Sequence, residues 1–204
     1  AKQYAKERLQ GTRRDGSRIP IIQHPDVRRM LMTMKSGIEA MRALALTAAA
    51  EIDRARYAAD DASQAQHEAR VELLTPIVKG WLTEMSQELT SLGIQVYGGM
   101  GYIEETGAAQ HYRDARILTI YEGTTGIQAL DFIGRKTLVD KGEALAVLLQ
   151  EMQATLAMVK AQAGLDAAIA TNLAQALHAG NEAREWILAN AAQDANLAGT
   201  ASVS

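Results

Sequence analysis

A single carboxylate in a glycine-containing bend is the residue of this sequence best suited to acid–base chemistry. The stretch TIYEGTTGIQ (119–128) places Glu122 between Tyr121 and Gly123, in a chain that otherwise has the composition of helices. A general base needs reach toward its substrate and surroundings that raise its pKa toward the working pH. The same acid, just ahead of a helix that we expect to start near Thr124, equally suits the positive end of that helix. The residue types alone leave both interpretations open.

The stretch GGMG (98–101) is a second candidate for binding chemistry. A phosphate-binding glycine loop follows a strand and opens a helix, whereas this stretch closes a predicted helix. The spacing therefore favours a helix C-terminus with glycines in left-handed backbone geometry. The functional alternative is that bare glycine backbone lies against a flat ligand.

The remaining polar clusters favour structural roles. HYRDARIL (111–118) places Arg113, Asp114 and Arg116 on one short helix, which we interpret as a salt-bridged face that holds the bend. The four histidines form neither an HExxH motif nor paired Glu-x-x-His motifs, so no metal site is predicted. The absence of cysteine excludes disulfides and thiolate chemistry.

Two long helices must position these residues. Apolar side chains recur at spacings of three and four from Val27 to Ile52, which predicts a helix that begins at His24-Pro25-Asp26. A second stripe from Val71 to Val96 predicts an antiparallel partner, the pattern of a helix bundle.

Shorter elements complete the predicted bundle. We expect a helix over about 108–118 and another from Thr124 to about Leu138, while LQGTRRDGSRIPII (9–22) is predicted to be a loop. After VDKGE the composition shifts to an alanine-rich helical hairpin with a frayed tail, NLAGTASVS (196–204). The predicted fold class is all-α: an up-down four-helix bundle over residues 1–138, followed by an α-helical hairpin extension over 143–204.

Composition limits the partners. The net charge of -3 argues against nucleic acid, and no apolar run approaches the roughly 18 residues of a membrane span, so no integral membrane segment is expected. The first residues, AKQYAKERLQG, lack the apolar core of a signal peptide, which favours a soluble, cytoplasmic protein. Because the chain begins without Met and without a helix cap, we expect it to be a piece of a longer polypeptide.

One continuous stretch carries a specific family pattern. QVYGGMGYIEETGAAQHYRDARILTIYEGTTGIQALDFIGRK (95–136), together with YAKERLQG near the start, closely resembles the C-terminal domain of acyl-CoA dehydrogenases. The resemblance covers about residues 1–137, and 143–204 resembles the C-terminal extension of the large members of that family. It implies that a helical domain and a β domain precede this bundle in the complete enzyme.

The resemblance also implies a reaction, the α,β-dehydrogenation of an acyl-CoA thioester. A carboxylate removes the α-proton, the β-hydrogen passes as hydride to N5 of FAD, and electrons leave to an electron-transferring flavoprotein. The family motif places the base at Glu122, whose backbone N–H also holds the thioester carbonyl together with a ribityl hydroxyl. Desolvation of the base and stabilisation of the forming enolate explain why the site needs a carboxylate there. A homo-oligomer, dimer or tetramer, is implied as well.

The implied cofactor contacts fall on five positions. Arg8 matches the arginine that meets the FAD pyrophosphate of a neighbouring subunit, and Gln95, Gly98 and Gly99 match the segment along the adenosine half, also across a subunit interface. Thr124 matches the threonine that touches the FAD. The resemblance therefore favours the ligand-binding interpretation of GGMG.

Substrate contacts are implied for Tyr121 and Gly123, which line the acyl-CoA pocket. The chain departs from the family pattern after Arg8, where Leu9-Gln10-Gly11 keeps the glutamine but lacks an aromatic residue, and an inserted loop (12–20) follows. Two alternatives to the dehydrogenase are a non-catalytic helical oligomerisation module and an oxygen-using acyl-CoA oxidase-like enzyme. We expect this chain alone to be inactive, and the extension to pack between subunits.

Overall fold

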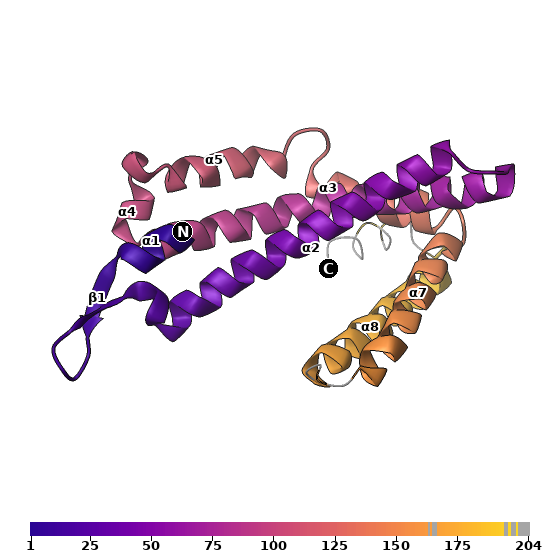
Figure 1. Cartoon of the computed structure of the whole chain (residues 1–204). Coiled ribbons are helices and arrows are strands. Elements are labelled where there is room, and N and C mark those ends of the chain that lie inside the picture. The colour runs from indigo at the N-terminus through magenta and orange to yellow at the C-terminus, as the bar shows by residue number, and fades with distance from the viewer. Residues whose placement is uncertain (163, 165–166, 194–195, 197–198, 200–204) are drawn as a thin grey trace. The chain divides into compact units, whose positions relative to one another are not determined.

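The computed structural model is almost entirely helical, which confirms the all-α class (Figure 1). It describes residues 1–162, 164, 167–193, 196 and 199, so the predicted fraying of 196–204 falls mostly outside the described residues. In chain order the elements are α1 Lys2–Glu7, β1 Leu9–Thr12, β2 Arg18–Pro20, the 3₁₀ turn η1 Ile21–Gln23, α2 Pro25–Arg56, α3 Asp61–Tyr97, α4 Gly99–Tyr102, the 3₁₀ turn η2 Glu104–Thr106, α5 Ala108–Leu118, α6 Thr125–Leu130, the π-helix η3 Asp131–Thr137, α7 Glu143–Ala161 and α8 Ala167–Asn190.

The described chain divides into two compact units. The first unit contains residues 1–50 and 78–125, and the second contains 51–77 and the residues from 126 onward. Both predicted long helices are confirmed, and α3 continues through Pro76 without interruption. The predicted boundary between a bundle at 1–138 and an extension at 143–204 stays a prediction.

The core of the first unit brings the ends of distant segments together. Buried side chains from α1, η1, α2 and α3 form one apolar cluster, made of Ala5, Ile21, Met30 and Val96. Farther along, α2 and α3 approach closely at Gly37, because a Cβ at that position would lie only 3.1 Å from a methyl group of Leu89. This close packing holds α3 rigidly against α2, and the candidate site residues lie along α3.

The prediction of a loop over 9–22 was wrong, because β1 and β2 form an antiparallel hairpin. Gly16 has φ of 84°, and the Asp15 carboxylate accepts hydrogen bonds from the Ser17 backbone N–H at 2.9 Å and the Ser17 hydroxyl at 2.7 Å. Asp-Gly is a strong hairpin signal. The two strands are too short and too exposed to show an alternating apolar pattern, so the Asp-Gly turn was the one local signal for them in the sequence.

The helix predicted over 108–118 is confirmed as α5. The next predicted helix, from Thr124 to about Leu138, has a different form. Its α-helical part begins at Thr125, and from Asp131 the backbone is π-helical, with the Leu138 N–H bonded to the Ile133 carbonyl five residues back at 2.9 Å. Thr137 is fully buried and its hydroxyl donates to the Phe132 carbonyl at 2.8 Å, which supports the wider helical turn.

The second unit contains the predicted helical hairpin, α7 and α8. Leu149, Leu156 and Leu177 are its buried apolar contacts. Arg184 Nε on α8 donates to the carbonyl of Gly142, the N-cap of α7, at 2.9 Å, which closes the hairpin. Glu151 on α7 pairs with Arg70 on α3 at 2.5 Å, which ties the hairpin to the rest of this unit.

Candidate active site and cofactor groove

The bend between α5 and α6 holds Glu122 in an uncommon backbone conformation. Glu122 has φ of 54° and Gly123 has φ of 91°, so two successive residues are on the left-handed side. A left-handed conformation costs a non-glycine residue about 1–2 kcal/mol and persists where surrounding contacts enforce it. Such strain identifies the bend as a candidate functional segment, with an exposed Glu122 at its apex.

One lysine on α3 supplies two of those contacts. Lys79 Nζ donates to the Leu118 carbonyl at 2.8 Å and to the Gly123 carbonyl at 2.6 Å. The first oxygen belongs to the last turn of α5, where carbonyls lack helical partners, and the second follows Glu122 directly. The ammonium group therefore bridges the two sides of the bend.

A second anchor on α3 fixes the far end of the bend. The Thr125 hydroxyl donates to Glu84 Oε1 at 2.5 Å, and the Thr125 backbone N–H bonds to the Thr119 carbonyl at 3.3 Å. Thr119 is buried, and the Arg116 guanidinium hydrogen-bonds to its hydroxyl. The segment that includes Tyr121, Glu122, Gly123 and Thr124 is thus held at both ends.

The predicted role of HYRDARIL as a structural face agrees with its contacts. Arg113 forms a two-pronged ion pair with Glu104, with distances of 2.9 and 2.7 Å. Hydrogen bonding to Arg113 lowers the pKa of the Glu104 carboxyl, and the same contact raises the pKa of Arg113. The pair joins α5 to η2.

Four predicted cofactor residues line one groove at the other end of α3. Arg8, Gln95, Gly98 and Gly99 all border a groove of about 920 Å³, together with Gln10 from β1. The side chains of Arg8 and Gln95 are exposed. A cationic guanidinium beside side-chain amides suits an extended anionic ligand such as a dinucleotide.

The glycines of this groove differ in what they would tolerate. Gly98 has φ of 61° and ψ of -142°, a region that residues with a Cβ rarely occupy, and the space around its missing Cβ and that of Gly99 is open. A Cβ on Gly101 would lie 2.4 Å from the Ile94 carbonyl, so this glycine is required by packing. Gly98 and Gly99 instead present bare backbone to the groove, which fits the approach of a bulky ligand.

The structure thus separates the predicted site residues into two sets. The bend carries Tyr121, Glu122, Gly123 and Thr124, while the groove carries Arg8, Gln95, Gly98 and Gly99. Lys79 marks the bend on α3 and Gln95 marks the groove, and a helix that rises 1.5 Å per residue puts them roughly 24 Å apart.

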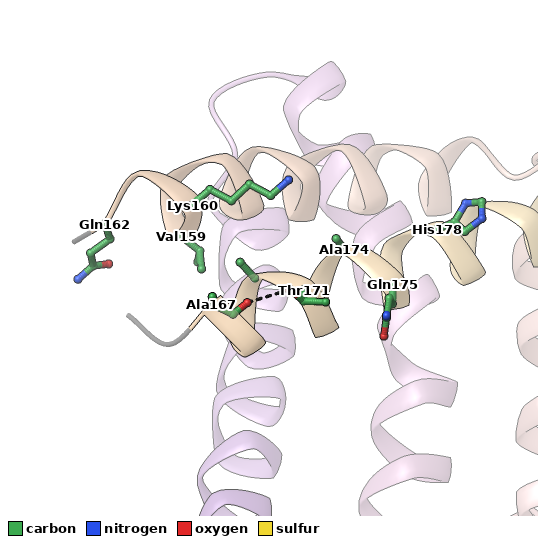
Figure 2. A pocket seen from close by; sticks show the side chains of 9 residues that line it. Val159, Lys160, Gln162, Ala167, Thr171, Ala174, Gln175 and His178 are labelled. Atoms are coloured by element: carbon green, nitrogen blue, oxygen red, sulfur yellow. Dashed lines mark hydrogen bonds between the residues drawn. The ribbon is translucent and has the colours of Figure 1, made fainter. Parts of the chain in front are cut away.

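A further groove, of about 590 Å³, lies between the ends of α7 and α8 and contains none of the predicted residues (Figure 2). Its Thr171 hydroxyl donates within its own helix to the Ala167 carbonyl at 3.0 Å. Within the described part of the chain, no group of three or more metal-ligating side chains gathers, and no helix has the length and hydropathy of a membrane span.

Comparison with known proteins decides the family. The model of the family described as "Acyl-CoA dehydrogenase, C-terminal domain" matches residues 1–138. This chain belongs to the acyl-CoA dehydrogenase family. A 3-methylmercaptopropionyl-CoA dehydrogenase of Ruegeria pomeroyi is 46% identical over 203 residues, which are 98% of this chain and 34% of that protein.

Other relatives of this acyl-CoA dehydrogenase chain agree. A broad-specificity linear acyl-CoA dehydrogenase of Mycobacterium tuberculosis is 41% identical over 160 residues, 75% of this chain and 26% of that protein. The chain therefore spans about a third or less of the length of these relatives. The solved structure of Bd2924 in its apo form superposes with a TM-score of 0.63 over 98% of this chain and 37% of that chain; at 22% identity this shows the fold alone.

Sequence reasoning missed Lys79 and Glu84, the two residues of α3 that hold the bend of this acyl-CoA dehydrogenase chain. Lys79 lies 39 and 44 positions away from its two carbonyl partners, and Glu84 lies 41 positions from Thr125. The one available signal was a lysine directly after Val78 in the apolar stripe of α3, a position at which an ammonium group needs a polar partner.

Proposed function

We propose that this chain forms the C-terminal part of an FAD-dependent acyl-CoA dehydrogenase and that Glu122 is the base that removes the α-proton. The observation that carries the proposal is the backbone of Glu122, which is held on the left-handed side at the apex of a bend with fixed ends. The YEGT sequence of the bend is also the family position for the base.

The reaction needs a base that is oriented and a carbonyl that is polarised. Proton removal from carbon next to a thioester generates negative charge on the carbonyl oxygen, which nearby N–H donors stabilise. In the proposed site the Glu122 carboxylate accepts the α-proton and the Glu122 N–H donates to the carbonyl. Tyr121 and Gly123, on either side, contact the acyl-CoA.

The residues of the groove fit the FAD that the family implies. Arg8 would hold the pyrophosphate by charge-assisted hydrogen bonds, and Gln95 with the bare backbone of Gly98 and Gly99 would border the adenosine half. Thr124 would contact the FAD from the bend. FAD, when bound, would accept the hydride that leaves the β-carbon.

The proposed partners follow from the same family. A homo-oligomer, dimer or tetramer, would bring the groove of one subunit to the cofactor of another, and an electron-transferring flavoprotein would take the electrons. Peroxide formed in stoichiometric amounts under air would instead identify oxygen as the acceptor and overturn the dehydrogenase assignment.

The test is Glu122→Gln in the complete enzyme that contains this chain. The substitution keeps the size of the side chain and its left-handed backbone and removes only the basic oxygen. We expect kcat for acyl-CoA dehydrogenation to fall by about 10² to 10⁴. Glu105→Gln, on an exposed acid of η2, is the matched control and should retain full activity. Activity of Glu122→Gln within about tenfold of the unmodified enzyme would show that Glu122 is not the base.

A further inference from the structure

The bend that carries the proposed base is held by a charged group on a different helix. Lys79 lies half-buried on α3, and both of its hydrogen-bond acceptors are main-chain carbonyl oxygens, at 2.8 Å from Leu118 and 2.6 Å from Gly123. We propose that Lys79 is a positioning residue for Glu122, an inference that rests on the proposed function of the bend.

The chemistry of the two acceptors explains why the position carries a lysine. Carbonyl oxygens need donors, and an ammonium group is a compact set of three donors with no acceptor of its own. The Leu118 carbonyl is in the last turn of α5, where the helix dipole favours a positive charge. One lysine thereby caps α5 and restrains the residue next to Glu122.

The restraint acts where the chain is most permissive. Glycine adopts positive and negative φ with similar ease, so Gly123 by itself would let the peptide between Gly123 and Thr124 rotate. The 2.6 Å bond from Lys79 fixes the orientation of the Gly123 carbonyl, and with it the backbone direction at Glu122. Misplacing a reacting group by about 1 Å can lower the rate by roughly 10²-fold.

The anchor formed by Thr125 and Glu84 cannot replace this restraint. It lies two residues after Gly123, and it holds the first residue of α6 rather than the carbonyl of Gly123. Loss of Lys79 would therefore leave the bend attached at Thr125 but remove the hydrogen bond that orients the Gly123 carbonyl.

The experiment compares Lys79→Met and Lys79→Gln with Lys136→Met in the complete FAD-loaded enzyme. Methionine keeps most of the side-chain volume without the ammonium group, and glutamine keeps donors on a shorter stem. Lys136 is the matched control, because it is a similarly sheltered lysine whose 2.9 Å partner is the side chain of Glu72.

For Lys79→Met we expect kcat to fall about ten- to hundredfold with KM for acyl-CoA changed less than about threefold. Hydrogen exchange at the amides of residues 119–125 should accelerate more than tenfold while the thermal midpoint stays close to that of Lys136→Met. Lys79→Gln should be intermediate in both measurements, which also tests the inference if the methionine variant does not fold.

Wild-type kcat in both Lys79 variants, or wild-type exchange at 119–125, would overturn the inference. An equal loss of kcat in Lys136→Met would overturn it too, since a general loss of stability would then explain the effect. Hydrogen exchange is measured without turnover, so it tests the restraint by Lys79 independently of catalysis. The proposed function is judged by Glu122→Gln alone, and the two failures can therefore be told apart.

Discussion

Lys79 and Gln95 lie sixteen positions apart on one uninterrupted helix, with the Glu122 bend held at Lys79 and the Arg8 groove bordered by Gln95. A rise of 1.5 Å per residue makes this separation roughly 24 Å. In the proposed reaction both the proton and the hydride leave carbons beside Glu122, so this separation places the groove far from the proposed chemistry of its own chain. We therefore expect each active site to combine the bend of one subunit with the groove of another.

Subunit complementation tests this arrangement. Arg8→Ala chains and Glu122→Gln chains should each form inactive or weakly active homo-oligomers, for want of cofactor and of base respectively. A mixed dimer should recover about half of the wild-type activity, because one of its two equivalent sites joins an intact Glu122 to an intact Arg8. Differently tagged chains would be co-expressed, purified as the mixed oligomer and assayed for acyl-CoA dehydrogenation.

The control for complementation places both substitutions on one chain, and here we expect no recovery of activity by a fully intact site. A chain with both Arg8→Ala and Glu122→Gln, combined with an unmodified chain, should have no fully intact site if the groove acts across subunits. Half activity in this mixture, with none in the first, would place Arg8 and Glu122 in the same site of one chain.

Substitutions of the groove glycines should separate folding from cofactor binding. Gly99 opens α4 with free space around its missing Cβ, so Gly99→Ala should change the free energy of unfolding by less than about 1 kcal/mol. If backbone approach to FAD is the reason for this glycine, the variant should purify with less bound flavin, measured by absorbance per protein.

Gly101→Ala is the contrasting variant. Its Cβ would meet main-chain carbonyl oxygen of Ile94 at 2.4 Å, so the backbone of α3 or α4 must shift. We expect a loss of about 1–3 kcal/mol in the free energy of unfolding, measured by thermal or urea unfolding.

Equal flavin content in Gly99→Ala and the unmodified enzyme would argue that the groove does not bind FAD through its backbone.

The sequence predicted well those features that depend on local periodicity. The stripes from Val27 to Ile52 and from Val71 to Val96 are confirmed as α2 and α3, because a long amphipathic helix repeats its signal over many turns. The hairpin at 9–20 was missed because two strands of four and three residues repeat too little pattern to outweigh an arginine-rich loop composition.

The supports of the candidate site depend on contacts that no local pattern contains. Glu122 was a candidate base because of its glycine-containing bend, and the family motif favoured that role. Neither its left-handed backbone nor its restraint by Lys79 follows from its neighbours in sequence. A main-chain carbonyl as acceptor makes such a contact harder to foresee, since every residue offers one and the partner's identity leaves no trace in the sequence.

Removal of the extension should test its predicted place between subunits. Deleting 143–204 from the complete enzyme removes α7 and α8 and leaves the half-buried Arg70 without its partner Glu151. We expect a change in oligomer size by sizing chromatography with light scattering. Glu151→Gln, which removes the ion pair and keeps the hairpin, should retain the original oligomer. An unchanged oligomer after deletion would contradict a packing role between subunits.

The stability of the second unit should depend on pH through Glu51. Burial of Glu51 alone would raise its pKa, but hydrogen bonds from His67 at 2.7 Å and from Arg54 at 2.5 Å outweigh burial and lower the pKa below the ordinary 4.5. The folded state therefore binds this proton less tightly than the unfolded state. Its contribution to stability is present above about pH 4.5 and is lost as the pH falls through the lower value of the folded protein.

Glu51→Gln should remove that contribution. Near pH 7 we expect it to lower the free energy of unfolding by about 1–2 kcal/mol, since a neutral amide replaces the buried carboxylate that accepts from His67 and from the largely exposed Arg54. The difference between the variant and the unmodified protein should shrink as the pH falls below about 4.5, because the unmodified carboxyl then loses its charge in the unfolded and finally in the folded state. Urea unfolding of both proteins between pH 7 and pH 3 measures this difference in the free energy of unfolding. A difference that stays constant from pH 7 to pH 3 would mean that lost packing, rather than the charge of Glu51, causes the destabilisation.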